Sequence, residues 1–159
     1  MKNYILRLKF FIHWITRYLL QLKNYNILSE KSGDNLKFLA LNKGRYGQIT
    51  KVLSQMHAKY ADNFDMAELA KESGMSVSAF HSHFKAITHY TPLQYLKEIR
   101  LHKARLMMLQ DNMTASRAAS IVGYSSNSQF SREFKRLFGD APTIDSAKMK
   151  KSWLKEKSE

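Results

Sequence analysis

The fold is decided by the stretch Gly123–Pro142, which reads GYSSNSQFSREFKRLFGDAP. Its large apolar residues recur at the spacing of one helical face, which predicts that they are buried: Phe130, Phe134, Leu137 and Phe138. The opposite face carries amide, hydroxyl and cationic groups, which suit base edges and phosphates better than a protein core. Gly123 allows a left-handed turn before this helix, and Gly139 and Pro142 end it. The stretch therefore predicts the turn and second helix of a helix-turn-helix unit.

Residues 74–92 repeat this pattern at an offset of 49 or 50 residues. Each copy has a glycine, two phenylalanines four residues apart and a proline eight residues after the second phenylalanine: Gly74, Phe80, Phe84 and Pro92, then Gly123, Phe130, Phe134 and Pro142. A short alanine-containing segment precedes each glycine, at Leu69-Ala70 and at Ala118-Ala119. Two copies are too few to build a solenoid, so the repeat indicates two linked helix-turn-helix modules.

The chain is strongly basic. Its 159 residues include 26 Lys and Arg against 13 Asp and Glu, a formal net charge of +13. This excess indicates a polyanionic partner, either nucleic acid or an anionic membrane surface. The sequence has no cysteine, which excludes disulfides and thiolate metal sites. Only two prolines and six glycines interrupt it, which favours a mostly helical protein.

Helix start and stop signals divide the chain into three parts. Four N-cap signals are present: Asp65, Ser76, Thr91 and Thr114. Residues 1–47 are expected to form an N-terminal helix and a connector, and residues 145–159 a Lys-rich tail. The part between them, residues 48–144, is expected to open with a helix from about Gln48. It is predicted to comprise a first module, a long linker helix and a second module: residues 48–91, 92–110 and 111–144.

Residues 4–22 are strongly apolar but contain several cationic residues. A membrane span would bury Lys9 and Arg17 at a cost of roughly 2.5–3.5 kcal/mol each at mid-bilayer, so a span is not expected. No small-residue cleavage site follows, so a secretory signal is not expected either. The favoured interpretation is a helix that packs on the rest of the protein or on a second copy. A basic helix on a membrane surface and a poorly ordered segment stay open as alternatives.

A set of residues at fixed spacing runs through both modules: Leu69-Ala70, Gly74-Met75-Ser76, Phe80-His81, His83-Phe84-Lys85, Thr88, Thr91-Pro92, Tyr95, Arg100-Leu101, Ala104-Arg105, Ala118-Ala119 and Val122-Gly123-Tyr124, followed by the stretch quoted above. This set resembles the DNA-binding domain of AraC/XylS-type bacterial transcription regulators over about residues 48–144. The resemblance implies an all-α fold of about seven helices, with two homeodomain-like helix-turn-helix subdomains joined by a long linker helix, besides the N-terminal apolar, basic helix. It also implies that two recognition helices enter adjacent major grooves, ~34 Å apart.

By position, the resemblance implies base contacts from both recognition helices: Ser78, His81 and Ser82 in the first, and Asn127, Ser128, Gln129, Ser131 and Arg132 in the second. It implies phosphate contacts from three cations: Lys85, Lys135 and Arg136. Arg132 suits guanine, and Asn127 or Gln129 suits adenine, each good pair giving ~1–3 kcal/mol of discrimination. The first helix has no arginine among its base-facing residues. It is therefore expected to make fewer base contacts and to discriminate less sharply between sequences in its half-site.

The sequence therefore indicates a sequence-specific, double-stranded-DNA-binding transcription regulator, an activator acting in the bacterial cytoplasm at the nucleoid. Two further partners are considered, RNA polymerase and a second copy of the chain bound through the N-terminal helix; a membrane is not the expected partner. Two alternatives stay open. One is a truncated regulator fragment that binds nucleic acid without sequence preference, and the other is a basic protein associated with a membrane surface.

No enzymatic activity, metal or cofactor is expected. No nucleophile–base arrangement, phosphate loop or ligand cluster is apparent, and His81 and His83, two residues apart on a helix, do not face each other. Many AraC/XylS-type regulators carry an N-terminal effector domain, for which the residues ahead of Ile49 are too few. Regulation by abundance is therefore expected.

Overall fold

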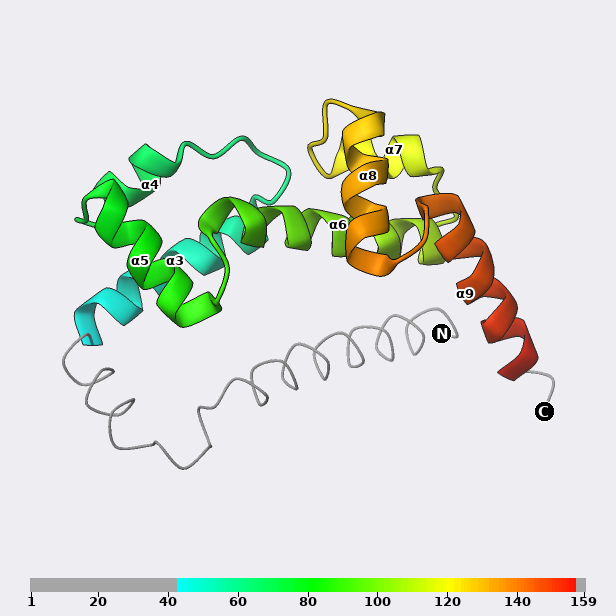
Figure 1. Cartoon of the computed structure of the whole chain (residues 1–159), viewed down its shortest axis with the longest axis horizontal. Coiled ribbons are helices and arrows are strands. Elements are labelled where there is room, and N and C mark those ends of the chain that lie inside the picture. Colours follow the sequence, from blue (N-terminus) through cyan, green and yellow to red (C-terminus); the bar gives the residue numbers. More distant parts are fainter. Residues whose placement is uncertain (1–42, 157–159) are drawn as a thin grey trace. The chain divides into compact units, whose positions relative to one another are not determined.

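Helices account for every regular element in residues 43–156, the part of the chain that this computed structural model describes (Figure 1). In chain order they are α3 (Lys43–Ala58), α4 (Met66–Glu72), α5 (Val77–Thr88), α6 (Pro92–Gln110), α7 (Ala115–Ile121), α8 (Asn127–Phe138) and α9 (Pro142–Glu156). The predicted all-α fold is confirmed: α4 and α5 form one helix-turn-helix unit, α7 and α8 form the other, and α6 joins them. The helix predicted within residues 4–22 lies outside the described residues.

The predicted N-caps start four of these helices. Side-chain oxygens of the four capping residues accept hydrogen bonds from backbone N–H groups in the first turn: Asp65 at α4, Ser76 at α5, Thr91 at α6 and Thr114 at α7. At α6 the Gln94 side-chain oxygen also accepts from the Thr91 backbone N–H (3.2 Å), which completes a capping box. α3 begins at Lys43, earlier than the predicted start near Gln48.

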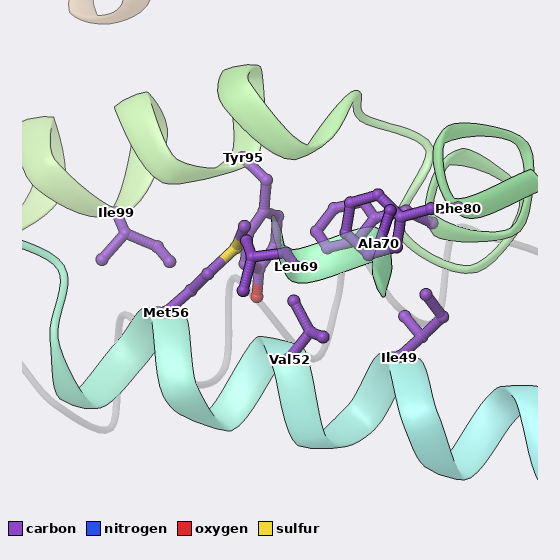
Figure 2. Packing of buried hydrophobic residues seen from close by; sticks show 9 residues of the cluster. Ile49, Val52, Met56, Leu69, Ala70, Phe80, Tyr95 and Ile99 are labelled. Carbon is purple, nitrogen blue, oxygen red and sulfur yellow. The ribbon is translucent and has the colours of Figure 1, made fainter. Parts of the chain in front are cut away.

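Two hydrophobic cores pack against α6. The first draws on α3, α4, α5 and α6: Ile49, Val52, Met56, Leu69, Ala70, Phe80, Phe84, Tyr95 and Ile99. Figure 2 shows the α3 side chains Ile49, Val52 and Met56 pointing toward the other helices of this core. The second core draws on α6, on α7 with its C-cap residue, and on α8: Leu101, Ala104, Met108, Ala118, Ala119, Val122, Phe130 and Phe134. Because α6 supplies residues to both cores, it is a shared structural element of the two units.

The repeat in the sequence extends to the pattern of burial. Residues 79–92 and 129–142, at an offset of 50, have the same degree of burial position by position. In each copy the two phenylalanines four residues apart are fully buried: Phe80 and Phe84 on α5, Phe130 and Phe134 on α8. α5 and α8 therefore present equivalent faces to solvent.

The start of α9 is docked against α6. Asp145 is buried, and its carboxylate accepts two hydrogen bonds from Arg105, at 2.8 Å from Nε to Oδ2 and 2.6 Å from Nη2 to Oδ1. The same guanidinium lies over the Phe138 ring, 4.4 Å from its centroid. The segment predicted as a Lys-rich tail thus begins with a residue that α6 holds in place.

Glu133 joins α8 to α6. Its Oε1 accepts hydrogen bonds from Lys97 Nζ (2.6 Å) and Gln129 Nε2 (3.1 Å), and its Oε2 accepts from the Tyr124 hydroxyl (2.7 Å). Burial raises the pKa of Glu133, but the three donors outweigh burial and hold the pKa below its usual value. Burial and the hydrogen bond to Glu133 raise the pKa of Tyr124, which therefore stays protonated and donates.

Gly123 and Gly139 have nearly the same φ but different surroundings. Their φ values are +88° and +89°, in a region that other residues rarely adopt. A Cβ added to Gly123 would lie 2.4 Å from the carbonyl oxygen of Ala61, whereas one added to Gly139 would meet no atom within 4 Å. The turn of the second unit therefore lies directly against the loop between α3 and α4.

These two glycines form a matched pair for measuring that contact. Gly139→Ala is expected to lower the free energy of unfolding by about 1–2 kcal/mol, the cost of a positive φ. Gly123→Ala is expected to lower it by roughly 1–3 kcal/mol more, because the added methyl group forces the backbone to shift. Urea denaturation of both variants measures the difference. Equal losses would contradict the close approach to Ala61.

Glu133→Gln is expected to lower the free energy of unfolding by about 2 kcal/mol at pH 7, because charge-assisted hydrogen bonds are lost and Lys97 is left without its partner. Folding lowers the pKa of Glu133, so its contribution is present above the unfolded value of about 4.3 and is lost as pH falls through the folded value. The difference from wild type should therefore shrink below about pH 4.

Urea denaturation at neutral and acidic pH measures this difference. Asp140→Asn is the control, because Asp140 pairs with Lys148 at 2.7 Å in an exposed ion pair, which is worth no more than about 1 kcal/mol. The role of Glu133 is disproved if its variant and the control respond alike to pH.

Candidate nucleic-acid interface

The buried phenylalanines of α8 turn its polar residues outward. Five of the residues predicted to contact DNA are exposed on this helix: Asn127, Ser128, Arg132, Lys135 and Arg136. Two more, Ser131 and Gln129, are half-buried. Hydroxyl, amide and cationic groups thus share the exposed face, as the helical spacing predicts. Such a face can donate to phosphate oxygens and base edges.

Arg132 is available for an external partner. The two acids nearest to it in sequence are engaged elsewhere: Glu133 with Lys97, and Asp140 with Lys148. Among residues 44–152, whose side chains the structure describes, no hydrogen bond or ion pair engages the Arg132 guanidinium, which is exposed. An exposed guanidinium with all its donors free can form a bidentate pair with guanine O6 and N7.

The two amides of α8 have partners within the protein. Asn127 Nδ2 donates to Ser116 Oγ (2.8 Å), which ties the first residue of α8 to α7. Gln129 Nε2 donates to Glu133 Oε1 (3.1 Å). Asn127 stays exposed, whereas Gln129 lies between the exposed face and the Glu133 network. Gln129 is thereby the more constrained of the two amides.

The exposed face of α5 carries fewer cationic groups than that of α8. Ser78, Ser82 and Lys85, which the family resemblance implies as DNA contacts, are exposed. His81 is half-buried, with its ring edge-to-face against Phe80 at 6.0 Å between centroids. His83 is also half-buried, and its Nε2 accepts from the Arg45 guanidinium at 3.0 Å, which ties α5 to α3.

Sequence reasoning missed Val77 and Arg117. Val77, at the start of α5, is 48% exposed and occupies the position that Asn127 has on α8. Its methyl groups suit the C5-methyl of thymine, and comparing the two copies of the repeat would have identified it. Arg117 is exposed on α7, directly after the Ser116 that Asn127 contacts. Arg117 is thus a further exposed cation, on the helix that contacts the first residue of α8.

Other kinds of site find no support in the part of the chain that the structure describes. Among residues 44–152, whose side chains the structure describes, no three His, Asp or Glu side chains cluster closely enough to hold a metal ion. No helix among the same residues is long and apolar enough to span a membrane. The apolar segment 4–22 lies outside this range.

Comparison with known proteins agrees with this geometry. A family model described as a helix-turn-helix domain matches residues 69–144. The HTH-type transcriptional regulator AlkR of Acinetobacter baylyi is 35% identical over 95 residues, which are 60% of this chain and 31% of AlkR. The HTH-type transcriptional activator RhaS of Pectobacterium carotovorum is 27% identical over 94 residues, 59% of this chain and 34% of RhaS. The chain thus spans about a third of the length of the curated relatives it matches.

Solved structures share the fold. A transcriptional regulator with an AraC-type DNA-binding domain from Chromobacterium violaceum is similar with a TM-score of 0.60 and 25% identity, over 67% of this chain and 95% of that one. The DNA-binding domain of AdpA, solved in complex with a target DNA, is similar with a TM-score of 0.59 and 24% identity, over 62% of this chain and 89% of that one. On these similarities, residues 69–144 with their tandem helix-turn-helix units form a helix-turn-helix domain similar to the DNA-binding domains of AraC-type transcription regulators.

Proposed function

We propose that this protein is a sequence-specific double-stranded-DNA-binding transcription regulator that inserts α5 and α8 into adjacent major grooves. The observation that carries the proposal is the equivalence of these two helices. Each buries a phenylalanine pair and exposes the opposite polar face at matching positions. The AdpA domain, which has the same fold, was solved with its target DNA bound, and the relatives AlkR and RhaS are named as transcription regulators.

The proposed roles of the residues follow from chemistry and exposure. Arg132 reads a guanine, and the other base contacts come from residues of both recognition helices: Ser78, His81, Ser82, Asn127, Ser128, Gln129 and Ser131. Lys85, Lys135 and Arg136 neutralise phosphates and set the register on the duplex. The net charge of +13 adds affinity that is independent of sequence and falls as salt rises. Specificity then comes mainly from α8, the recognition helix with an exposed, unengaged arginine.

The proposal extends to the biology of the protein. It acts in the bacterial cytoplasm at the nucleoid, without an enzymatic activity of its own. It activates transcription through contact with RNA polymerase, and the apolar segment within residues 4–22 pairs two copies. These roles rest on the family, in which RhaS is named as an activator.

Selection of bound duplexes from a random DNA pool tests the central proposal. At physiological salt, where binding without sequence preference is weak, we expect an enriched motif of two boxes about one helical turn, or ~34 Å, apart. Enrichment of a single box would mean that only one recognition helix reads sequence. Bound DNA without any enriched motif would refute specific regulation and favour a basic fragment held by charge.

Arg132→Ala is expected to weaken binding to the selected site by about 1–3 kcal/mol and to relax specificity at one base pair. Lys135→Ala, a neighbouring exposed cation of α8, is the matched control. It should weaken binding evenly on all sequences and reduce the slope of log affinity against log salt by about 1. Titration of labelled duplexes, with each base pair of the site varied in turn, measures both effects. An even loss for Arg132→Ala would reassign it to phosphate.

A further inference from the structure

One side chain in the middle of α6 is bonded to both helix-turn-helix units. Arg100 stands between Ile99, which belongs to the first core, and Leu101, which belongs to the second. Its guanidinium donates to three backbone carbonyl oxygens: Nε to Tyr60 (2.7 Å), Nη2 to Asp62 (2.8 Å) and Nη1 to Gly123 (3.1 Å). Tyr60 and Asp62 precede α4 in the first unit, whereas Gly123 forms the turn of the second unit. The guanidinium therefore bridges the two units.

The same two segments also touch each other directly. Gly123 approaches the loop between α3 and α4 so closely that a Cβ would lie 2.4 Å from the carbonyl oxygen of Ala61. The Tyr60 side chain packs against both hydrophobic cores, and Lys103 Nζ lies 5.5 Å from the centroid of its ring. The loop and the turn thus form a connection between the units that does not run along α6.

This second connection restricts a motion that α6 alone permits. Two units attached only to one helix can change their relative orientation when that helix bends or twists. A contact beside the helix opposes such motion, because it joins the two units at a second point away from the helix axis. Arg100 suits the task because its planar guanidinium presents five donors in a fixed fork, whereas a lysine ammonium offers a single point charge. Burial lowers the pKa of Arg100, which reflects its enclosure among these carbonyl groups.

We propose that Arg100 is a positioning residue that sets the separation and relative rotation of the two recognition helices. It thereby determines which spacing between two DNA boxes the protein accepts. This inference rests on the proposed function, since it concerns how DNA is read. Inserting one base pair moves a box by ~3.4 Å along the duplex and by roughly 35° around it. A rigid pair of helices cannot follow both changes, whereas a loosely joined pair can.

The rigidity can be measured without DNA. The chain has no cysteine, so Lys71→Cys and Ser120→Cys, at exposed positions of α4 and α7, allow one spin label on each unit. Pulsed dipolar spectroscopy should give one narrow distance distribution in this labelled parent and a broader one after Arg100→Met. Arg105→Met is the matched control, because Arg105 lies on the same helix but bonds Asp145 of α9. It should leave the distribution narrow.

Two results would overturn the rigidity of this connection. One is a broad distribution in the labelled parent, and the other is an unchanged narrow distribution after Arg100→Met. Arg100→Lys, which keeps the charge but not the fork, is made in parallel in case the methionine variant does not fold. Its distribution should be broader than that of the parent. Circular dichroism and thermal unfolding confirm that the compared variants are folded.

Selection from pools with variable spacers tests the consequence for DNA. For the wild type and for Arg105→Met, changing the preferred spacing by one base pair should weaken binding about tenfold or more, comparable to the loss of one base contact. For Arg100→Met or Arg100→Lys the same two boxes should be recovered, with the penalty for changing the spacing reduced to about twofold. A lower affinity with an unchanged spacing preference would make Arg100 merely structural and overturn the proposal. Recovery of one box or of no motif with the wild type would instead contradict the proposed reading of two adjacent grooves, while the distance measurement would still decide whether Arg100 fixes the units.

Discussion

Burial of two phenylalanines four residues apart is the constraint on which the exposed faces of α5 and α8 depend. In α5 the rings of Phe80 and Phe84 lie 5.8 Å apart, and in α8 those of Phe130 and Phe134 lie 5.5 Å apart. Residues four apart share one face of a helix, so burying both fixes the rotation of the helix about its axis. The residues on the opposite face then have to point to solvent. The polar surface of each unit is therefore a consequence of its core.

The two units use this common frame with different chemistry. Position 83 in α5 and position 133 in α8 are equivalent, and each anchors the side of its helix to another element. His83 accepts from Arg45 of α3, whereas Glu133 accepts from Lys97 of α6. The exposed faces differ as well, since α8 carries Arg132 and α5 carries serines and the exposed Val77. The same scaffold thus presents chemically different exposed faces on α5 and α8.

Much of the fold could be predicted because its signals are local. The caps at Asp65, Ser76 and Thr91 act within a few residues, and the phenylalanine spacing is a property of one helix. The candidate interface was predicted less completely. The exposed face of α8 followed from helical spacing, and its residues are placed on that face. The hydrogen bond from Gln129 to Glu133 could not be predicted in this way. Gln129 is half-buried, and helical spacing does not show whether such a residue faces solvent or binds a neighbouring side chain.

The sequence by itself determined where the capped helices α4, α5, α6 and α7 begin, which faces the phenylalanine-bearing helices bury and that the pattern occurs twice, because each of these follows from interactions within about one or two helical turns. Only the tertiary structure decided the partners of the charged groups. Arg100 bonds carbonyl groups 23, 38 and 40 residues away, Arg105 bonds Asp145 40 residues away, and Lys97 bonds Glu133 36 residues away. Such partners are set by how the helices pack around α6, and no periodicity in the chain encodes them. The relative placement of the two recognition helices belongs to this second group, because it depends on contacts between segments that are distant in the chain.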